Sequence, residues 1–161
     1  MIREYTKDNC SKILNVINDA AFRYKGTIPD ECWHEPYMSK HELENEFKNG
    51  VRMFGYLENN ELIGVIGFQK TKDVILIRHA YTLTKHQGTG KGTKLLKFLL
   101  EKNKNSRLLV GTWKSATWAI KFYEKFGFKI HNKEQSSILL KKYWSIPSKQ
   151  IENSVVLEKY K

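Results

Sequence analysis

The sequence predicts an α/β (α+β) fold with a mixed, mostly antiparallel central sheet of six to seven strands flanked by about four helices. Three observations support this class. Two stretches with helical apolar spacing come first, an alternating strand hairpin follows, and two strand–helix pairs come after it. With 161 residues, 40% of them hydrophobic, the chain has the size and apolar content of a single domain over residues 1–161.

The N-terminal part of the chain predicts one strand and two helices. "MIREYT" can open a strand, and residues 7–24 carry the apolar stripe of an amphipathic helix, formed by Ile13, Val16, Ile17, Ala20, Ala21 and Tyr24. Residues 25–38 contain two prolines and no period, which indicates a loop. Ser39 and Glu42 form a capping box, so a second helix is expected from there to Gly50.

The remaining residues predict a hairpin around "NNE" and then alternating strands and helices. Strands are expected at 51–58, 62–70, 74–83, 107–112, 136–141 and 154–159, and helices at 89–104 and 115–127. The element order is then β-α-α-β-β-β-α-β-α-β-β. The run at 74–83 is more continuously apolar than the two hairpin strands, so it is expected to be a central strand where the sheet changes from antiparallel to parallel.

Composition narrows the class of protein. No apolar run is long enough to span a bilayer, the N-terminus lacks the apolar stretch of a signal peptide, and Cys10 and Cys32 lack metal-site spacing. We therefore expect a cytoplasmic protein with no metal and no membrane contact. Lys and Arg outnumber Asp and Glu by 28 to 17, a net charge of +11. Because the lysines are dispersed and arginine–aromatic clusters are absent, we expect a solvated basic surface and no nucleic-acid partner.

The most informative stretch is the loop "QGTGKGT" at residues 87–93. It does not fit the P-loop of nucleoside triphosphatases, because Lys85 stands where that motif needs glycine and Gly92 where it needs a hydroxyl. It does not fit the dinucleotide fingerprint either, because Thr93 takes the place of the third glycine. A plain glycine-rich turn joining a strand to a helix is an alternative.

A third pattern, [QR]-x-x-G-x-[GA], fits at Gln87, Gly90 and Gly92. Alternate glycines let the backbone turn sharply and approach a ligand without interference from Cβ atoms. The amides of residues 88–93 can then converge at the positive end of the following helix. The loop therefore predicts a main-chain cradle for a pyrophosphate, with Lys91 as a surface residue and no catalytic lysine.

Two blocks of the chain resemble the GNAT superfamily of acetyl-coenzyme A-dependent N-acyltransferases. "HAYTLTKHQGTGKGTKLLKFLL" (79–100) is similar to that family's strand, pyrophosphate loop and helix. "LVGTWKSATWAIKFYEKFGF" (109–128) is similar to its next strand and helix, with the pattern A-x-x-x-Y-x-x-x-G-F at Ala119, Tyr123, Gly127 and Phe128. The element order also agrees over essentially the whole chain, which implies a GNAT-like fold.

The resemblance implies a site for acetyl-CoA. The backbone of Ala80, Tyr81 and Thr82 would pair with the pantetheine arm, and Gln87 would stand at the entrance of the loop. The pyrophosphate would be held by Gly88, Thr89, Gly90, Lys91, Gly92 and Thr93, and Ala119 would lie beside the cofactor. Thr82 and Gly111–Thr112 would line the gap between two splayed strands. One position departs from the family pattern: Ala116 stands where asparagine is common, so Ser115 or another neighbour would have to supply that hydrogen bond.

Tyr123 is the candidate general acid. It shares a helix face with Ala116, Ala119 and Ile120, and the two alanines leave room for an elongated ligand. A phenol near the thioester can donate a proton to the departing thiolate. The alternative is that Tyr123 is a core aromatic residue.

His79 is the candidate general base, against a structural histidine or a water-mediated route. Strand alternation places Arg78 on the same face as Ala80 and His79 on the opposite face, unless a bulge intervenes. His34 and Glu35 are further candidates, and Arg78 could instead bind a substrate carboxylate. Segment 25–39 and the tail 143–160 are expected near the acceptor pocket, although Trp33 and Tyr37 could simply pack the loop and the tail could form a homodimer edge.

The resemblance implies an N-acetyltransferase that acts on a primary amine of a small molecule or peptide. The alternatives are a coenzyme A-binding module that senses the cofactor without turnover, and acetylation associated with RNA, for which the sequence offers no aromatic platform.

Overall fold

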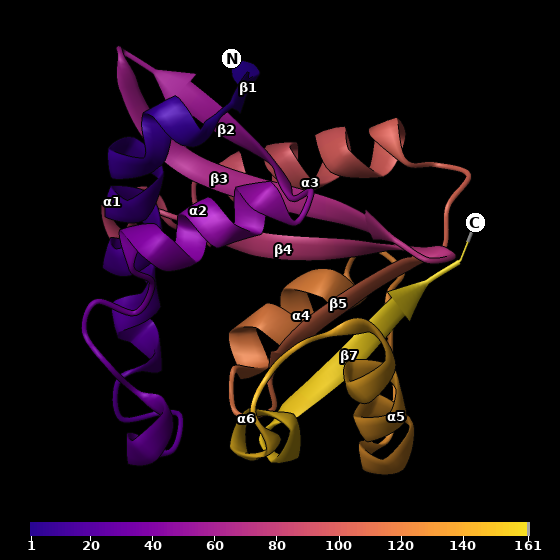
Figure 1. Ribbon diagram of the computed structural model, residues 1–161. Helices are drawn as coiled ribbons and strands as arrows, with labels where there is room; N and C mark the ends of the chain where they lie inside the picture. The colour runs from indigo at the N-terminus through magenta and orange to yellow at the C-terminus, as the bar shows by residue number, and fades with distance from the viewer. Residues whose placement is uncertain (161) are drawn as a thin grey trace.

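The computed structural model describes residues 1–160 and contains one seven-stranded sheet with six α-helices. The elements are β1 (Ile2–Tyr5), α1 (Cys10–Ala21), α2 (Lys40–Lys48), β2 (Arg52–Glu58), β3 (Glu61–Thr71), β4 (Val74–Thr82), α3 (Lys91–Lys102), β5 (Leu108–Trp113), α4 (Thr117–Glu124), β6 (Lys129–Ile130), α5 (Lys133–Tyr143), α6 (Ser148–Glu152) and β7 (Ser154–Lys159). The strand order is β1-β2-β3-β4-β5-β7-β6, and only the β4–β5 pair is parallel (Figure 1). The predicted mixed sheet is confirmed.

The hairpin expected around "NNE" is present between β2 and β3. Asn59 and Asn60 both have positive φ, 51° and 63°, and the flanking Glu58 and Glu61 pair across the turn. Two consecutive residues with positive φ match the twist of the adjoining strands, and asparagine tolerates this conformation better than most residues.

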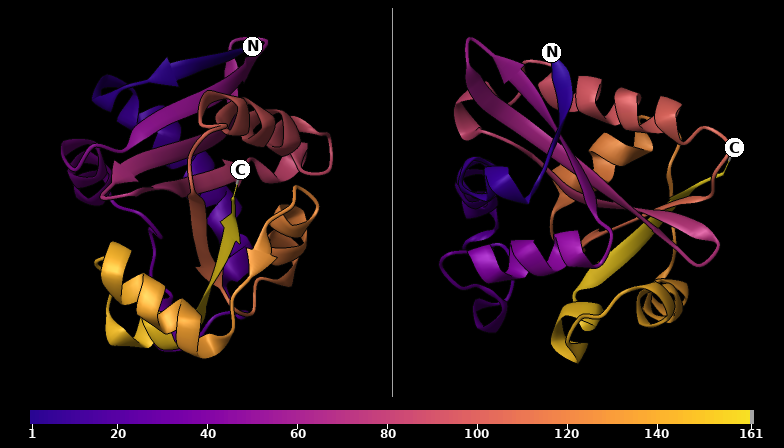
Figure 2. Two further views of the ribbon diagram at one scale, coloured as in Figure 1. Left: turned by 90° about the vertical axis from the view of Figure 1, so that its right-hand side faces the viewer. Right: turned by 45° about the horizontal axis from the view of Figure 1, so that its top comes forward.

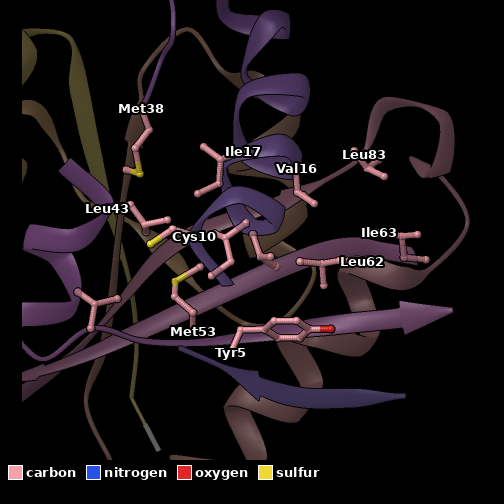
Figure 3. Packing of buried hydrophobic residues seen from close by; sticks show 13 residues of the cluster. Tyr5, Cys10, Val16, Ile17, Met38, Leu43, Met53, Leu62, Ile63 and Leu83 are labelled. Atoms are coloured by element: carbon pink, nitrogen blue, oxygen red, sulfur yellow. The ribbon is translucent and has the colours of Figure 1, made fainter. Parts of the chain in front are cut away.

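Helices cover both faces of the sheet. Helices α1 and α2 lie on one face of β2–β4 and α3 lies on the other (Figures 1 and 2). Figure 3 shows Ile17 of α1, Leu43 of α2 and Met53 of β2 pointing toward one another, and all three are fully buried. The predicted stripe of α1 is buried up to Ala21, so burial of this apolar face holds the helix on the sheet.

The strand predicted at 136–141 is wrong, because these residues form part of α5. Asn132 caps this helix, since its side-chain oxygen accepts a hydrogen bond of 2.8 Å from the Gln135 amide. Leu139, Leu140 and Tyr143 are buried while Ile138 is 53% exposed, which is a helical and not an alternating pattern. A short apolar run of this kind does not distinguish a strand from a helix, whereas the Asn132 cap favours the helix.

Three further elements differ from the expectation. The short strand β6 and the helix α6 lie where no element was predicted, and α6 together with α5 brings the number of α-helices to six, where about four were expected. The helix expected over 7–24 is divided, because short 3-10 turns precede and follow α1. No helix within residues 1–160 is long and apolar enough to cross a bilayer.

Strand β7 lies between β5 and β6 and fixes the C-terminal half of the sheet. Its pairing with β5 runs from Leu108 to Trp113, whereas β4 pairs with β5 only from Ile75 to Ile77. The two parallel strands therefore part, and Figures 1 and 2 show β5 and β7 inclined away from β4.

A buried carboxylate stabilises the C-terminal strands. Glu158 of β7 is 8% exposed and accepts a hydrogen bond of 2.7 Å from Arg107 Nε. It also accepts one of 2.8 Å from His131 when the Nε2 atom of that histidine carries a hydrogen. Burial opposes the charged form, but the hydrogen bonds from Arg107 and His131 hold the pKa of Glu158 below its ordinary value. Because the pKa of Glu158 is lower in the folded than in the unfolded protein, its carboxylate stabilises the fold fully at any pH above its unfolded-state pKa. This stabilisation is lost as the pH falls through the folded-state pKa.

Glu158→Gln should lower the free energy of unfolding at pH 7 by about 1–3 kcal/mol, because Arg107 and His131 lose a charged partner. The variant should also lose less stability than the native protein when the pH falls from 7 to 4. Urea unfolding at both pH values measures this, with Glu101→Gln on an exposed ion pair as the control. An equal acid dependence in Glu158→Gln and the native protein would contradict the role given to Glu158.

Candidate functional site

Strand β4 contains a β-bulge at the position where the site begins. Arg78 pairs with Gly67 and Tyr81 pairs with Val65, so His79 and Ala80 together face the single residue Ile66 of β3. His79 has a φ of 54°, which is uncommon for a residue other than glycine. The bulge breaks the alternation that the sequence predicts for this strand.

Because of the bulge, Arg78 and His79 contact the same carboxylate on α2. Glu46 Oε1 lies 2.7 Å from Arg78 Nη2 and 3.1 Å from His79 Nε2, and Arg78 Nη1 donates to Gln69 Oε1 at 2.9 Å. Burial opposes ionisation of Glu46, but His79 and Arg78 hold its pKa below the ordinary value. The bulge is the exception to strand alternation that the sequence analysis allows for, so His79 and Arg78 do not lie on opposite faces, and the Arg78 guanidinium is already engaged by Glu46 and Gln69.

Two cavities of similar size lie where β4 and β5 part. The glycine-loop cavity, of about 480 Å³, is lined by the end of β4, residues 86–93 apart from Thr89, the end of α1 and one face of α4. The second cavity, of about 490 Å³, is lined by α2, the bulge, the end of β5, segment 31–38 and the tail from Trp144. Tyr24 and Tyr81 line both cavities, so the two spaces meet at these rings.

The backbone of the glycine loop has the conformation that the motif predicts. Gly88 and Gly90 have φ values of 77° and 85°, and Gly90 is the N-cap of α3 without a side-chain hydrogen bond to cap the helix. The first amides of α3 are therefore free of a side-chain cap at the positive end of the helix dipole. Gln87 donates to the carbonyl oxygen of Thr82 at 3.2 Å, which ties the loop to the end of β4.

The structure gathers the predicted cofactor-binding residues around the glycine-loop cavity, with one exception. The members of its lining are Ala80, Tyr81, Thr82, Gln87, Gly88, Gly90, Lys91, Gly92, Thr93 and Ala119. Thr89 is not among them, and its hydroxyl donates to the carbonyl oxygen of His86. Lys91 is not the surface residue that the sequence suggests. Its side chain is 16% exposed, and its ammonium lies 3.1 Å from Glu58.

The two cavities differ in charge. Arg23, Lys91 and Lys125 line the glycine-loop cavity, and no carboxylate of residues 1–160 does. The second cavity instead has three carboxylates, Glu31, Glu42 and Glu46, of which Glu31 pairs with Lys149 at 3.0 Å and Glu46 with Arg78 at 2.7 Å. Glu42 is left without a cationic partner in this lining, so in a chain of net charge +11 the glycine-loop cavity suits an anion and the second cavity is the more acidic of the two.

Tyr123 lies in the wall of the glycine-loop cavity and also packs in the core. It is 5% exposed and contacts the rings of Phe122 and Phe128 at centroid distances of 5.2 and 5.5 Å. Burial raises the pKa of its phenol, with a smaller effect from Tyr24, so the hydroxyl keeps its proton. This hydroxyl has no hydrogen-bond partner among residues 1–160, which leaves its proton available to a ligand.

The residues that the sequence predicts near an acceptor divide between the second cavity and its surroundings. His34, Tyr37, Met38, His79, Gly111, Thr112 and the tail residue Trp144 line the second cavity. Glu35 does not, because it pairs with Lys25 at 3.1 Å on the surface. Trp33 stacks on Tyr37 from outside, with ring centroids 5.8 Å apart. Ala116 is fully buried at the start of α4, and neither it nor Ser115 lines a cavity.

Several residues that line the two cavities lie outside the site predicted from the sequence. The expected core stripe of the first helix includes Tyr24, and no motif in the sequence marks Arg23, Glu46, Trp113 or Trp118. The indole nitrogen of Trp113 donates to Tyr37 Oη at 2.9 Å, and the Arg23 guanidinium lies 4.1 Å from the Trp118 ring. The one signal in the sequence is that aromatic residues are frequent in segments 22–37 and 113–123.

Comparison with known proteins identifies the family. The family profile described as "Acetyltransferase (GNAT) domain" matches residues 3–138, most of the chain. The chain belongs to the GNAT acetyltransferase family. A search of curated protein sequences gave no match.

Solved structures agree with this GNAT assignment at the level of the fold. PaiA N-acetyltransferase from Thermoplasma acidophilum, solved in complex with coenzyme A, superposes with a TM-score of 0.74 at 18% identity, covering 100% of this chain and 98% of that one. A GNAT-family acetyltransferase from Staphylococcus aureus Mu50 gives 0.72 at 15% identity, with 98% of each chain covered. Ribosomal-protein-alanine N-acetyltransferase from Brucella melitensis gives 0.69 at 16% identity, with 100% and 99% covered. Identities this low establish a shared fold and leave the substrate open.

Proposed function

We propose that this GNAT protein transfers the acetyl group of acetyl-CoA to a primary amine of a small molecule or peptide, by direct attack in a ternary complex. The observation that carries the proposal is the pair of cavities that meet at Tyr24 and Tyr81, one basic and one rich in carboxylates. A polyanionic acyl donor and a cationic acceptor can then reach a common point from opposite sides.

The glycine-loop cavity fits coenzyme A. Past Ile77, no strand within residues 1–160 pairs with the edge of β4 that faces β5, so the backbone of Ala80, Tyr81 and Thr82 can pair with an extended pantetheine arm. The uncapped amides at the start of α3 and the open glycines of residues 88–93 suit a pyrophosphate. Ala119 leaves space beside the arm. These groups bind and orient the donor without a metal ion.

Tyr123 is proposed as the general acid. Its phenol keeps its proton, lines the glycine-loop cavity and has no partner among residues 1–160. When the amine nitrogen bonds to the acetyl carbon and the carbon–sulfur bond breaks, Tyr123 donates a proton to the leaving thiolate.

His79 is proposed as the general base on the opposite side. With its Nε2–H donating to Glu46, Nδ1 keeps the lone pair that can accept a proton. The incoming ammonium must lose a proton before its nitrogen can attack, and His79 lines the cavity through which that amine enters. Glu46 fixes the tautomer and stabilises the imidazolium that forms.

The second cavity is proposed to bind the acceptor. Tyr37 and Trp113 give it aromatic walls, and Glu31, Glu42 and Glu46 give it carboxylates. Such walls attract ammonium groups by cation–π and ion-pair interactions. We therefore expect a cationic amine, which can be a small molecule or the amino group of a peptide.

The reaction is tested by thiol release from acetyl-CoA over a panel of amines, polyamines, amino acids and peptides. We expect at least one amine to stimulate release, and Tyr123→Phe to lower kcat with that amine by about 100-fold or more. Tyr143→Phe is the matched control, because the Tyr143 hydroxyl bonds to Asp73 away from both cavities. If no amine stimulates thiol release and coenzyme A still binds tightly, the proposed enzymatic function is refuted in favour of a module that senses coenzyme A without turnover.

His79→Gln should lower kcat/KM at pH 7 by about 100-fold, because the variant cannot take the proton of the ammonium. The deficit should shrink as the pH rises toward the pKa of the amine, since free amine then forms in solution. His41→Gln, on the exposed face of α2, should follow the native pH profile. A deficit independent of pH would assign His79 a structural role only.

A further inference from the structure

The junction between the two cavities consists of two tyrosine rings. Tyr24 and Tyr81 are the only residues that line both cavities, within the part of the chain that the structure describes. Tyr24 follows α1 in a short 3-10 turn, and Tyr81 follows the bulge of β4. Their rings meet edge to face with centroids 6.4 Å apart. Anything that passes from the second cavity to the glycine-loop cavity therefore passes Tyr24 or Tyr81.

The Tyr24 ring is held from several sides. It packs on Tyr37 and Trp113 of the second cavity, with centroid distances of 5.4 and 6.5 Å, and on Trp118 of the glycine-loop cavity at 6.0 Å. Its carbonyl oxygen accepts hydrogen bonds of 2.8 and 3.0 Å from the amides of Thr27 and Ile28, so the backbone beneath the ring is also fixed. The ring is thus placed across the gap between β4 and β5 by contacts on both sides.

This position has a chemical consequence. The second cavity is open and partly polar, so water enters it when no amine is bound. Water can attack the same thioester: its oxygen bonds to the acetyl carbon, the carbon–sulfur bond breaks, and one water proton passes to the thiolate, which gives acetic acid and free thiol. An enzyme that transfers to amines must keep this reaction slow.

We propose that Tyr24 determines the choice between amine and water. Its ring lines the passage between the two cavities and keeps the surroundings of the acetyl thioester apolar, so that water is poorly held there, while its face can contact the ammonium group of an amine that reaches the thioester from the second cavity. Tyr24 exchanges no proton in this role. Its flat apolar ring, and not its hydroxyl, is the part that acts. The inference rests on the proposed acetyl transfer and adds to it a determinant of the choice between amine and water.

The test compares thiol release from acetyl-CoA with and without the best amine of the panel. Tyr24→Ala removes this ring, so release without amine should rise several-fold while release with amine falls. Tyr24→Phe keeps the ring and should leave release without amine at the native level. Phe22→Ala removes an exposed ring two residues away, outside both cavities, and should change neither rate.

Binding and folding are measured in parallel. For each variant, calorimetry measures the affinity for coenzyme A and thermal unfolding measures stability, so a loss of the Tyr24 ring can be distinguished from a loss of the fold. Tyr24→Leu replaces Tyr24→Ala if Tyr24→Ala does not fold. The inference is overturned if Tyr24→Ala or Tyr24→Leu folds and binds coenzyme A but releases thiol without amine at the native rate. It is also overturned if thiol release without amine rises as much in Tyr24→Phe as in Tyr24→Ala. Failure of the native protein to acetylate any amine would instead refute the proposed function itself.

Discussion

The parallel strands β4 and β5 pair only at Ile75, Leu76 and Ile77 of β4, and beyond Ile77 the two strands are no longer paired. Strand β7 holds β5 on its other side through six paired residues, so β5 cannot bend back toward β4. The antiparallel pairing with β3 holds β4 in the same way. The gap is therefore enforced by both halves of the sheet, and both cavities and the aromatic rings between them lie around it.

The gap also explains why charge is divided within a strongly basic chain. On one side, the glycine loop and the start of α3 present amides and the side chains of Arg23 and Lys125. On the other side, α2 and segment 25–39 bring Glu46 and Glu31 to a cavity with aromatic walls. Partly buried Glu46 is stabilised by Arg78 and His79, which the bulge in β4 brings to the same carboxylate. Local backbone geometry thus sets the electrostatics of the second cavity.

Much of the fold could be predicted from the sequence because local and tertiary preferences agree. The stripe of α1, the capping box at Ser39 and the Asn59–Asn60 turn each act over a few residues, and the structure contains all three. The helix at 133–143 was missed because "SSILLK" fits a strand as well as a helix until the Asn132 cap is considered. A local hydrophobic pattern distinguishes a helix from a strand only where the periodic segment is long enough.

The site was less predictable, for a different reason. The glycine loop and the face of Tyr123 are contiguous motifs, and they line one cavity. Glu46, Tyr24 and Trp113 reach the site from three separate elements, and a bulge of one residue decides which way His79 points. Amide hydrogen exchange with and without coenzyme A shows which cavity binds the donor. We expect slower exchange at residues 80–82 and 88–93 on coenzyme A binding, with little change in α2. Protection centred on α2 and segment 31–38 instead would place the donor in the second cavity and refute its assignment to the glycine loop.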